Sequence, residues 1–240
     1  MINRRNFIQK WFGGTLAFIT ALLNPFLKVN AQSLDFIDND YVGKTRAGKF
    51  KNFYINFWKT MRRIHPETWT LLSDGLCNNP RRFSLEELKA LPEITQKSRL
   101  KCVECWSAPA EWKGFHYSSF AQLAQPLPSA NGAVVYCADD YIEHLSIDTL
   151  QQERVLFVYN MNQAPLSDEH GFPLRLIVPF KYGYKNPKSI IRIEWVNDVR
   201  YGTWSKIGPY SHDGTILPGY DHPLDQNKIR RRITGGEVPY

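Results

Sequence analysis

Short β-type runs separated by turn residues are the feature that most constrains this fold. The runs are rich in Val, Ile, Tyr and Phe, which favour strands, and Pro and Gly separate them. The few helices look short, and the clearest helix start is the capping box of Ser84 and Glu87, with an end expected near Pro92. We expect strands at 69–72, 99–103, 133–136, 155–159, 174–178 and 189–196, with a turn at 73–75. No parallel βαβ alternation is visible, so the pattern predicts a β-dominated α+β fold.

The chain length favours a single domain. At 240 residues the chain can bury one substantial core and is only marginally long enough for two. No fixed repeat, low-complexity tract or Pro-rich linker divides it. We expect one domain over 32–240, in which the polar and aromatic stretch 32–64 forms an extended arm that wraps the domain or helps line a site.

The N-terminus resembles an export signal. Arg4-Arg5 precedes Asn6-Phe7-Ile8-Gln9-Lys10, an uncharged stretch follows over 11–23, and Val29-Asn30-Ala31 suits a signal peptidase. A transmembrane anchor is the alternative, but this apolar run is short for a full span. Residues 1–31 are therefore predicted to be a twin-arginine signal peptide that is cleaved after Ala31, which places the mature protein in the periplasm. That export route is used largely by proteins that fold around a cofactor before they cross the membrane.

The charge distribution argues against nucleic acid as a partner. The net charge is +7, of which Arg4, Arg5, Lys10 and Lys28 in the signal contribute four, leaving +3 for the remainder. This excess is too small to indicate nucleic-acid binding. The basic tail over 228–232 has two readings, a solvated terminus or a docking site for an acidic partner.

The cysteines offer several kinds of chemistry. They stand at positions 77, 102, 105 and 137, and in an oxidising compartment a structural disulfide is the default expectation. Cys102 and Cys105 form a C-x-x-C pair, but Trp106 stands where covalent haem attachment needs His. A zinc site would need further ligands at suitable spacing. A thioredoxin-like pair should open a helix after a strand, whereas Pro109 and turn residues follow here.

The segment around Cys102 resembles a known metal-ligand motif. Arg-Leu-Lys-Cys-Val-Glu-Cys-Trp-Ser over 99–107, continuing to Trp112-Lys113-Gly114-Phe115, is similar to the molybdenum-pterin oxidoreductases of the sulfite oxidase fold family. In that family one Cys after a strand binds the metal and a Trp-x-Gly turn follows. The most similar branch comprises bacterial catalytic subunits that reduce methionine sulfoxide in periplasmic proteins, where the motif reads Cys-Val-Glu-Ala-Trp-Ser. The resemblance implies that Cys102 is the molybdenum ligand. It leaves Cys105 as a bystander or a second redox-active thiol.

A second segment, over 162–190, resembles another hallmark of the same family, and the overlap covers roughly 50–195. It contains His-Gly-Phe-Pro-Leu-Arg over 170–175 and Lys-Tyr-Gly-Tyr-Lys-Asn-Pro-Lys over 181–188. The resemblance implies that a molybdenum-molybdopterin cofactor is bound by His170, Arg175, Lys181, Asn186 and Lys188. An arginine can grip phosphate with two hydrogen bonds, and Lys181, Lys185 and Lys188 would add charge around the turn. The charges alone would favour a basic hairpin on the surface.

Two weaker similarities complete the predicted site. The stretch 50–57 resembles an arm that contacts the cofactor, which adds Asn52 and Tyr54, with Asn56 as a further candidate. The stretch 134–141 resembles a strand and loop on the substrate side of the metal, so Asp139 and Tyr141 are catalytic candidates, although an ordinary turn is equally compatible. Glu104 would shape the pocket beside Cys102.

The resemblance implies an enzyme that transfers an oxygen atom. Glu104 beside the metal disfavours a sulfite dianion, whereas a neutral sulfoxide escapes that repulsion, so sulfoxide reduction is preferred. The downstream His-Gly-Phe-Pro favours sulfite oxidation instead. The chain has no haem motif, flavin fingerprint or iron–sulfur cysteine set, so a membrane haem subunit or soluble cytochrome is expected as electron partner. Alternatives are a non-catalytic binding module of the same fold and a C-x-x-C thiol oxidoreductase.

Overall fold

The computed structural model describes residues 41–42, 46–47, 54–103, 107–208 and 210–216. The predicted signal segment, Asn52, Glu104, Cys105 and the basic tail lie outside these residues, as does the side chain of Tyr54. The elements are β1 (Tyr41–Val42), β2 (Arg46–Ala47), β3 (Tyr54–Ile55), β4 (Met61–Arg62), β5 (Thr70–Gly75), β6 (Arg81–Ser84), α3 (Leu85–Lys89), β7 (Glu93–Lys101), β8 (Ser107–His116), α4 (Tyr117–Ala124), β9 (Gly132–Cys137), β10 (Ile142–Ser146), α5 (Ile147–Leu150), β11 (Leu156–Met161), β12 (Ala164–Pro165), η1 (Asp168–His170), β13 (Arg175–Ile177), η2 (Gly183–Lys185), β14 (Ile190–Val196) and α6 (Thr203–Ile207).

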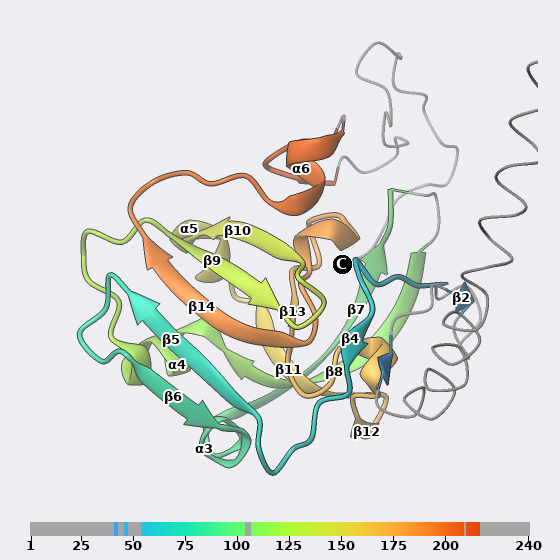
Figure 1. Cartoon of the computed structure of the whole chain (residues 1–240), viewed down its shortest axis with the longest axis horizontal. Helices are drawn as coiled ribbons and strands as arrows, with labels where there is room; N and C mark the ends of the chain where they lie inside the picture. The colour runs from blue at the N-terminus through green and yellow to red at the C-terminus, as the bar shows by residue number, and fades with distance from the viewer. Residues whose placement is uncertain (1–40, 43–45, 48–53, 104–106, 209, 217–240) are drawn as a thin grey trace, which may run out of the picture. The chain divides into compact units, whose positions relative to one another are not determined.

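Two five-stranded sheets carry the domain (Figure 1). The first has the order β10-β9-β14-β5-β6, in which only the β14–β5 pair is parallel. The second has the order β12-β11-β8-β7, with β13 also paired to β11, and all its pairs are antiparallel. The helices of the described chain are short, so the predicted β-dominated α+β class is confirmed.

The two sheets share one aromatic core. Phe120 on α4 lies at its centre, with its ring 5.4 Å from Phe83 and 6.2 Å from Trp195, which belong to the first sheet. The same ring lies 6.3 Å from Phe115 and 5.8 Å from Phe157, which belong to the second sheet. Each of these five side chains is at most 1% exposed. Burial of these rings therefore holds the two sheets together.

The predicted capping box is confirmed. Ser84 Oγ accepts a hydrogen bond from Glu87 N–H at 3.2 Å, and Glu87 Oε2 accepts one from Ser84 N–H at 2.8 Å. The helix ends at Lys89, a little before the expected end near Pro92.

Two predicted turns are wrong. Ser73 and Gly75 belong to β5, because the parallel strand β14 pairs with them as far as Trp195. Trp112 and Gly114 belong to β8, as does Pro109, so the segment after Cys102 continues as a strand. Strands β8 and β11 pass so close at position 114 that only glycine fits, since a Cβ there would collide with the backbone of Phe157 on β11.

The chain from Val42 onward forms one compact unit, and the predicted domain extent of 32–240 stays a prediction. The boundary at Ala31 stays a prediction. In the described part of the chain, every helix is too short or too polar to cross a membrane.

Candidate functional site

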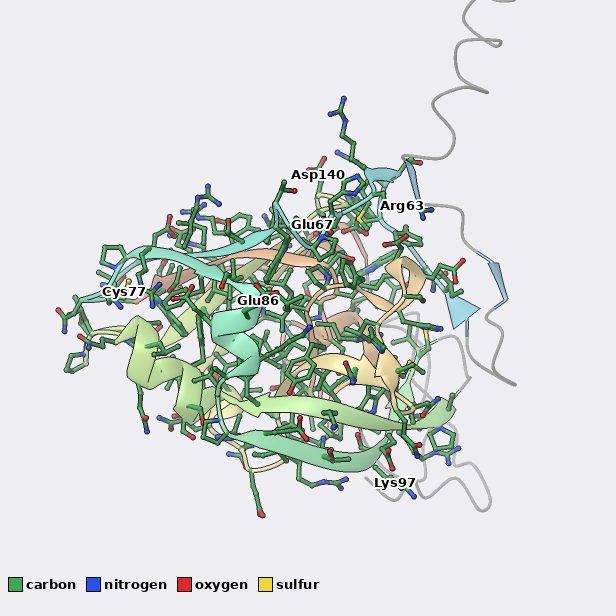
Figure 2. All side chains as sticks on the ribbon, turned by 90° about the horizontal axis from the view of Figure 1, so that it is seen from below. Arg63, Glu67, Cys77, Glu86, Lys97 and Asp140 are labelled. Atoms are coloured by element: carbon green, nitrogen blue, oxygen red, sulfur yellow. The ribbon has the colours of Figure 1, made fainter. Side chains whose placement is uncertain are left out.

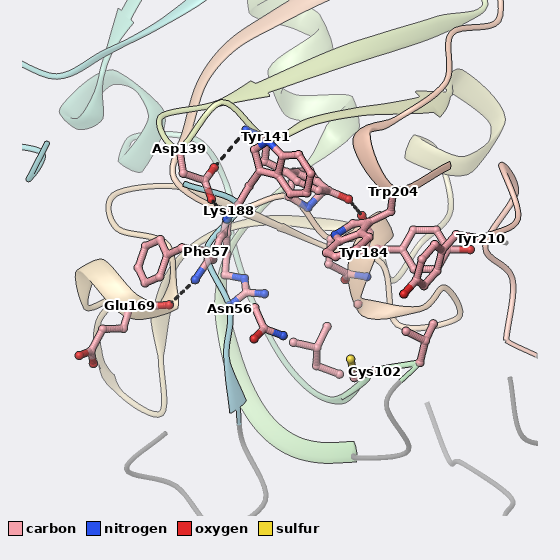
Figure 3. Close-up of a pocket in the computed structure, with 17 residues that line it drawn as sticks. Asn56, Phe57, Cys102, Asp139, Tyr141, Glu169, Tyr184, Lys188, Trp204 and Tyr210 are labelled. Atoms are coloured by element: carbon pink, nitrogen blue, oxygen red, sulfur yellow. Dashed lines mark hydrogen bonds between the residues drawn. The ribbon is translucent and has the colours of Figure 1, made fainter. Parts of the chain in front are cut away.

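Most predicted site residues with described side chains line one pocket. It lies among the arm before β4, the loop after β7, the β9–β10 turn, and the chain from η1 to β14 (Figure 3). The predicted residues that line it are Asn56, Cys102, Asp139, Tyr141, Arg175, Asn186 and Lys188. The structure thus brings together side chains from four separate parts of the sequence.

Cys102 lies at one end of this pocket, directly after the last residue of β7. It is partly buried and packs against a hydrophobic cluster that contains Val103, Tyr182 and Tyr184. A Cβ on Gly183 would lie 3.8 Å from the Cα of Cys102, so η2 passes close to the cysteine. The thiol is therefore held in an apolar surrounding that still opens to the pocket.

The other described cysteines lie apart from this position. Cys77 and Cys137 carry free thiols, so the structure contains no disulfide between them. Figure 2 shows Cys77 at the left edge of the domain, well apart from Asp140, the neighbour of the pocket residue Asp139. Cys137 is buried at the end of β9, and this burial raises the pKa of its thiol well above the ordinary value.

Two cations, Arg175 and Lys188, also line the pocket, and Figure 3 shows Lys188 apart from Cys102. Arg175 is buried, and its Nη1 donates to the carbonyl oxygen of His170 at 2.8 Å. Lys188 is partly buried; its Nζ donates to the carbonyl oxygen of Glu169 at 2.7 Å and lies 3.8 Å from the centroid of the Phe57 ring. Within the described chain neither cation forms an ion pair with a carboxylate, and the Nε of Arg175 has no hydrogen-bond partner.

The surroundings of Arg175 and Lys188 disfavour the charged form of each side chain. Burial, with Arg175 as the next cause, lowers the pKa of Lys188 to about 7. Burial also lowers the pKa of Arg175 to about 10. Two like charges held close together with little water attract an anion, because its charge offsets both repulsion and desolvation.

The backbone around Gly171 brings the two cations together. Arg175 and Lys188 face each other in an isolated antiparallel bridge. Gly171 has a φ of 102°, and a Cβ there would lie 2.5 Å from the Cβ of Lys188 and 3.2 Å from that of Arg175. His170 just before it is buried, and burial together with the two cations lowers its pKa to about 4. The imidazole is therefore neutral at neutral pH, and it does not line the pocket.

Lys181 and Lys185 lie outside the pocket, contrary to the expected cradle of three lysines. Lys181 Nζ donates to Asp213 Oδ1 at 2.8 Å and to Thr215 Oγ1 at 3.1 Å. Lys185 Nζ donates to Glu143 Oε1 at 2.6 Å. The surface hairpin alternative is also wrong, because Lys181 is 5% exposed and Lys185 2%. Each lysine is thus held by its own carboxylate, and neither lines the pocket.

Asp139 and Tyr141 line the pocket but bind mainly to backbone groups. Asp139 Oδ2 accepts from Trp58 N–H at 2.8 Å, its Oδ1 accepts from Tyr141 N–H at 3.2 Å, and burial raises its pKa. The hydroxyl of Tyr141 donates to the carbonyl oxygen of Tyr184 at 2.5 Å. Asn186 also binds a backbone group: its Oδ1 accepts a hydrogen bond from the N–H of Val178, the residue after β13, at 2.6 Å. These groups fix the arm and η2 around the pocket.

Sequence reasoning missed several aromatic residues of the pocket. Phe57, Trp58, Trp204 and Tyr210 all line it. Trp58 and Trp204 lie near the two ends of the described chain, yet their rings are 5.6 Å apart. No spacing in the sequence connects two residues so far apart, so only the arrangement of the fold reveals this contact.

The residues fit the cofactor that the resemblance implies. Molybdopterin carries a phosphate, and its metal takes a protein thiolate. The pocket has one cysteine at one end and two cations without a carboxylate ion pair elsewhere. The unmatched Nε of buried Arg175 is the group that a phosphate oxygen would complete.

A family comparison agrees with this geometry. The model described as "Oxidoreductase molybdopterin binding domain" matches residues 58–204, which include Cys102, Arg175 and Lys188.

Curated relatives match most of the chain. The "Protein-methionine-sulfoxide reductase catalytic subunit MsrP" of Pseudomonas syringae pv. tomato is 29% identical over 198 residues, covering 74% of this chain and 59% of the relative. The protein of the same name from Xanthomonas axonopodis pv. citri is 31% identical, covering 74% of this chain and 61% of the relative. The one from Gluconobacter oxydans is 32% identical, covering 71% of this chain and 61% of the relative. The chain therefore spans about three fifths of the length of these relatives.

A solved structure has the same fold. The sulfane dehydrogenase SoxCD from Paracoccus pantotrophus aligns with a TM-score of 0.56 and 17% identity, covering 73% of this chain and 55% of that one. At this identity the likeness concerns the fold alone.

Proposed function

The chain belongs to the family of oxidoreductase molybdopterin-binding domains, and from this premise we propose that it reduces a sulfoxide by oxygen-atom transfer. The observation that carries the proposal is the asymmetry of the pocket. Cys102 adjoins a neutral, mainly aromatic cluster, whereas Lys188, which is bridged to Arg175, lies apart from Cys102 in Figure 3. A neutral sulfoxide suits the first side and an anionic cofactor tail suits the second. The printed names of the relatives support the same substrate class.

Each residue has a role in this proposal. When bound, the molybdenum-molybdopterin cofactor supplies the two-electron oxygen-atom exchange. The Cys102 thiolate binds its metal, and Arg175 and Lys188 bind its phosphate. Asp139, Tyr141 and Asn186 hold the surrounding backbone in place through the hydrogen bonds described above.

The remaining predicted residues either lie outside the pocket or have side chains that the structure does not describe. Asn52 and Tyr54 contact the cofactor from the arm, and Glu104 shapes the pocket beside the metal. His170 accepts a hydrogen bond from Arg175 through its backbone carbonyl oxygen, and its neutral ring adds no further charge beside the cations. Lys181 has no direct part in cofactor binding, because Asp213 already holds its amine.

Reduction of a sulfoxide consumes two electrons and two protons and releases water. A separate redox protein must supply the electrons, and we propose a membrane haem subunit or a soluble cytochrome. The words "catalytic subunit" in the relatives' names support such a partner.

The decisive test uses protein made in cells that synthesise the pterin. Cys102→Ser should lose molybdenum and the reduction of N-acetylmethionine sulfoxide together. Cys105→Ser should keep near-stoichiometric molybdenum. Equal metal loss in both variants would exclude Cys102 as the ligand. Parent protein without molybdenum would indicate a binding module, and full activity without molybdenum would indicate a thiol oxidoreductase.

We also propose that residues 1–31 direct export to the periplasm by the twin-arginine machinery. The support is the sequence pattern around Arg4 and Arg5. The double change Arg4→Lys and Arg5→Lys should leave the precursor in the cytoplasm, as cell fractionation would show. Normal export of this variant would contradict the proposed signal.

A further inference from the structure

Trp112 is a buried residue of the first sequence motif that has no role in the proposed function. Its side chain is 0% exposed, and it does not line the pocket. It belongs to β8, which lies between β7 and β11 in the second sheet. Strand β7 ends just before Cys102, and β11 pairs with β13 at Arg175. Trp112 therefore lies between the strand that leads to the proposed metal ligand and the strand pair that holds the buried cation.

Two contacts fix the indole ring of Trp112 in this place. Its Nε1–H donates to the carbonyl oxygen of Ser98 on β7 at 3.3 Å, and the Cζ of Arg175 lies 5.1 Å from the centroid of the ring. At this distance the face of an aromatic ring attracts a guanidinium group. The ring also belongs to a buried cluster with Leu100, a residue of β7 that lines the pocket. The ring is thus oriented by a hydrogen bond on one strand while its face meets Arg175.

The indole supports Arg175 without neutralising it. A carboxylate would cancel the charge of the guanidinium, as Glu143 does for Lys185, whereas a neutral ring attracts the cation and leaves its charge for an anion. Burial lowers the pKa of Arg175 to about 10, so the charged form needs such support. The carbonyl oxygen of His170 holds Nη1, while Nε has no hydrogen-bond partner among the described residues. These contacts leave the Nε edge of the guanidinium for an incoming anion.

We propose that Trp112 is a positioning residue that holds the guanidinium of Arg175 in the orientation that binds the anionic end of the cofactor. The inference rests on the proposed function for the identity of the cofactor, and it adds a residue outside the pocket. The hydrogen bond to Ser98 fixes the ring, and the face of the ring fixes the plane of the guanidinium. Trp112 acts through Arg175 and takes no part in the chemistry at the metal.

The test measures how long the full-length, molybdenum-loaded protein retains its pterin. Pterin released after dilution is followed by the fluorescence of its oxidised form, and the remaining molybdenum is measured by mass spectrometry. The variants are Trp112→Met, Trp112→Phe and the matched control Trp195→Met. Trp195 is 1% exposed and its Nε1 also forms a buried hydrogen bond, but its ring packs against those of Tyr117 and Phe120.

Trp112→Met should raise the rate of pterin release about tenfold, because the guanidinium loses the ring face that orients it. Trp112→Phe keeps a smaller aromatic face and should raise the rate only about threefold. Trp195→Met should lose a comparable amount of stability in urea but release pterin at the parent rate. In an Arg175→Met background, adding Trp112→Met should change the rate by no more than about twofold, because the ring acts through Arg175.

A trifluorinated indole at Trp112, introduced through an expanded genetic code, makes the test independent of folding. Fluorine withdraws negative charge from the ring face at nearly constant volume, so pterin release should be about threefold faster with unchanged stability in urea. This variant decides the matter if Trp112→Met fails to fold.

Pterin release at the parent rate in Trp112→Met or with the trifluorinated ring would overturn the inference. Equal acceleration in Trp195→Met would also overturn it, as would an equal effect of Trp112→Met with and without Arg175. A loaded parent protein that fails to reduce a sulfoxide would contradict the proposed function alone, because cofactor retention does not depend on turnover. A parent protein without molybdenum and pterin would overturn both.

Discussion

The segment from Arg175 to Lys188 contains two kinds of enclosed cation. Lys181 and Lys185 each form an ion pair with a carboxylate, with Nζ–O distances of 2.8 and 2.6 Å. Arg175 and Lys188 donate to backbone carbonyl oxygens instead, at 2.8 and 2.7 Å. Among these four cations only Arg175 and Lys188 line the pocket.

Whether a buried cation has a carboxylate partner indicates whether it serves the fold or is available to bind a ligand. Glu143 is 0% exposed, so the charge of Lys185 is matched entirely inside the fold. Asp213 pairs with Lys181 nearer the surface: burial alone would raise the pKa of Asp213, but hydrogen bonds from Lys181 and Thr215 lower it to about 2. A cation enclosed without such a carboxylate destabilises the protein until an anion binds. The missing carboxylate therefore supports the proposal that Arg175 and Lys188 bind the cofactor.

The largest loss of stability is expected when the buried ion pair of Lys185 and Glu143 is broken. Lys185→Met leaves the carboxylate of Glu143 without its cation, which should lower the unfolding free energy by about 3–5 kcal/mol. Urea denaturation of the cofactor-free protein measures this change. The double variant Lys185→Met with Glu143→Gln is the control and should recover part of the loss. A single-variant loss below about 1 kcal/mol would mean that the pair is not a structural element.

A second prediction concerns the turn that joins the unpaired cations. Gly171→Ala should cost about 2 kcal/mol, because the backbone has a φ of 102° and the new Cβ would press on Lys188. It should also lower molybdenum content by displacing both cations. Gly183→Ala is the matched control in the pocket, since its Cβ would meet its nearest neighbours at 3.5 and 3.8 Å. Equal stability of the two alanine variants would contradict the required geometry at Gly171.

The third prediction uses the pH dependence of an unpaired cation. The folded-state pKa of Lys188 is about 7, below the ordinary 10.5. Between these values the unfolded chain binds more protons, so the contribution of Lys188 to unfolding free energy rises with pH and is least favourable below pH 7. In the cofactor-free protein, Lys188→Met should therefore be more stable than the parent at pH 6, by roughly 1–2 kcal/mol after allowance for solvent screening.

Urea titrations at pH 6 and pH 9.5 measure this difference, which should shrink at the higher pH. The same substitution should reduce molybdenum content, while activity per bound molybdenum stays constant. A stability difference that does not vary with pH would exclude Lys188 as an enclosed, unpaired cation. Full molybdenum content with lost activity would move Lys188 to the substrate side.

The smallest effect is expected at Lys181. Its partner Asp213 has a side chain 67% exposed, so water can solvate the carboxylate once the lysine is removed. Lys181→Met should therefore cost about 1 kcal/mol and leave molybdenum content unchanged. Thermal denaturation and metal analysis together test this. A fall in metal content as large as that of Lys188→Met would remove the distinction between the two kinds of cation.

Local signals in the sequence predicted local structure well. The capping box of Ser84 and Glu87 is confirmed because both partners lie within one helical turn. The run at 133–136 lies within β9, since its buried β-type residues favour a strand regardless of distant contacts. The turn expected at Ser73 to Gly75 failed because the pairing that makes it a strand comes from distant β14.

The sequence by itself determined the fold class and the residue types of the site, because two motifs in order carry the cysteine and the basic residues. Only the tertiary structure decided which cations face the pocket, since Glu143 and Asp213 reach Lys185 and Lys181 from other elements. It also decided that Trp58 and Trp204 meet in the pocket that Cys102 lines. Burial and partnership are set by contacts between residues far apart in the chain, and no local spacing encodes them.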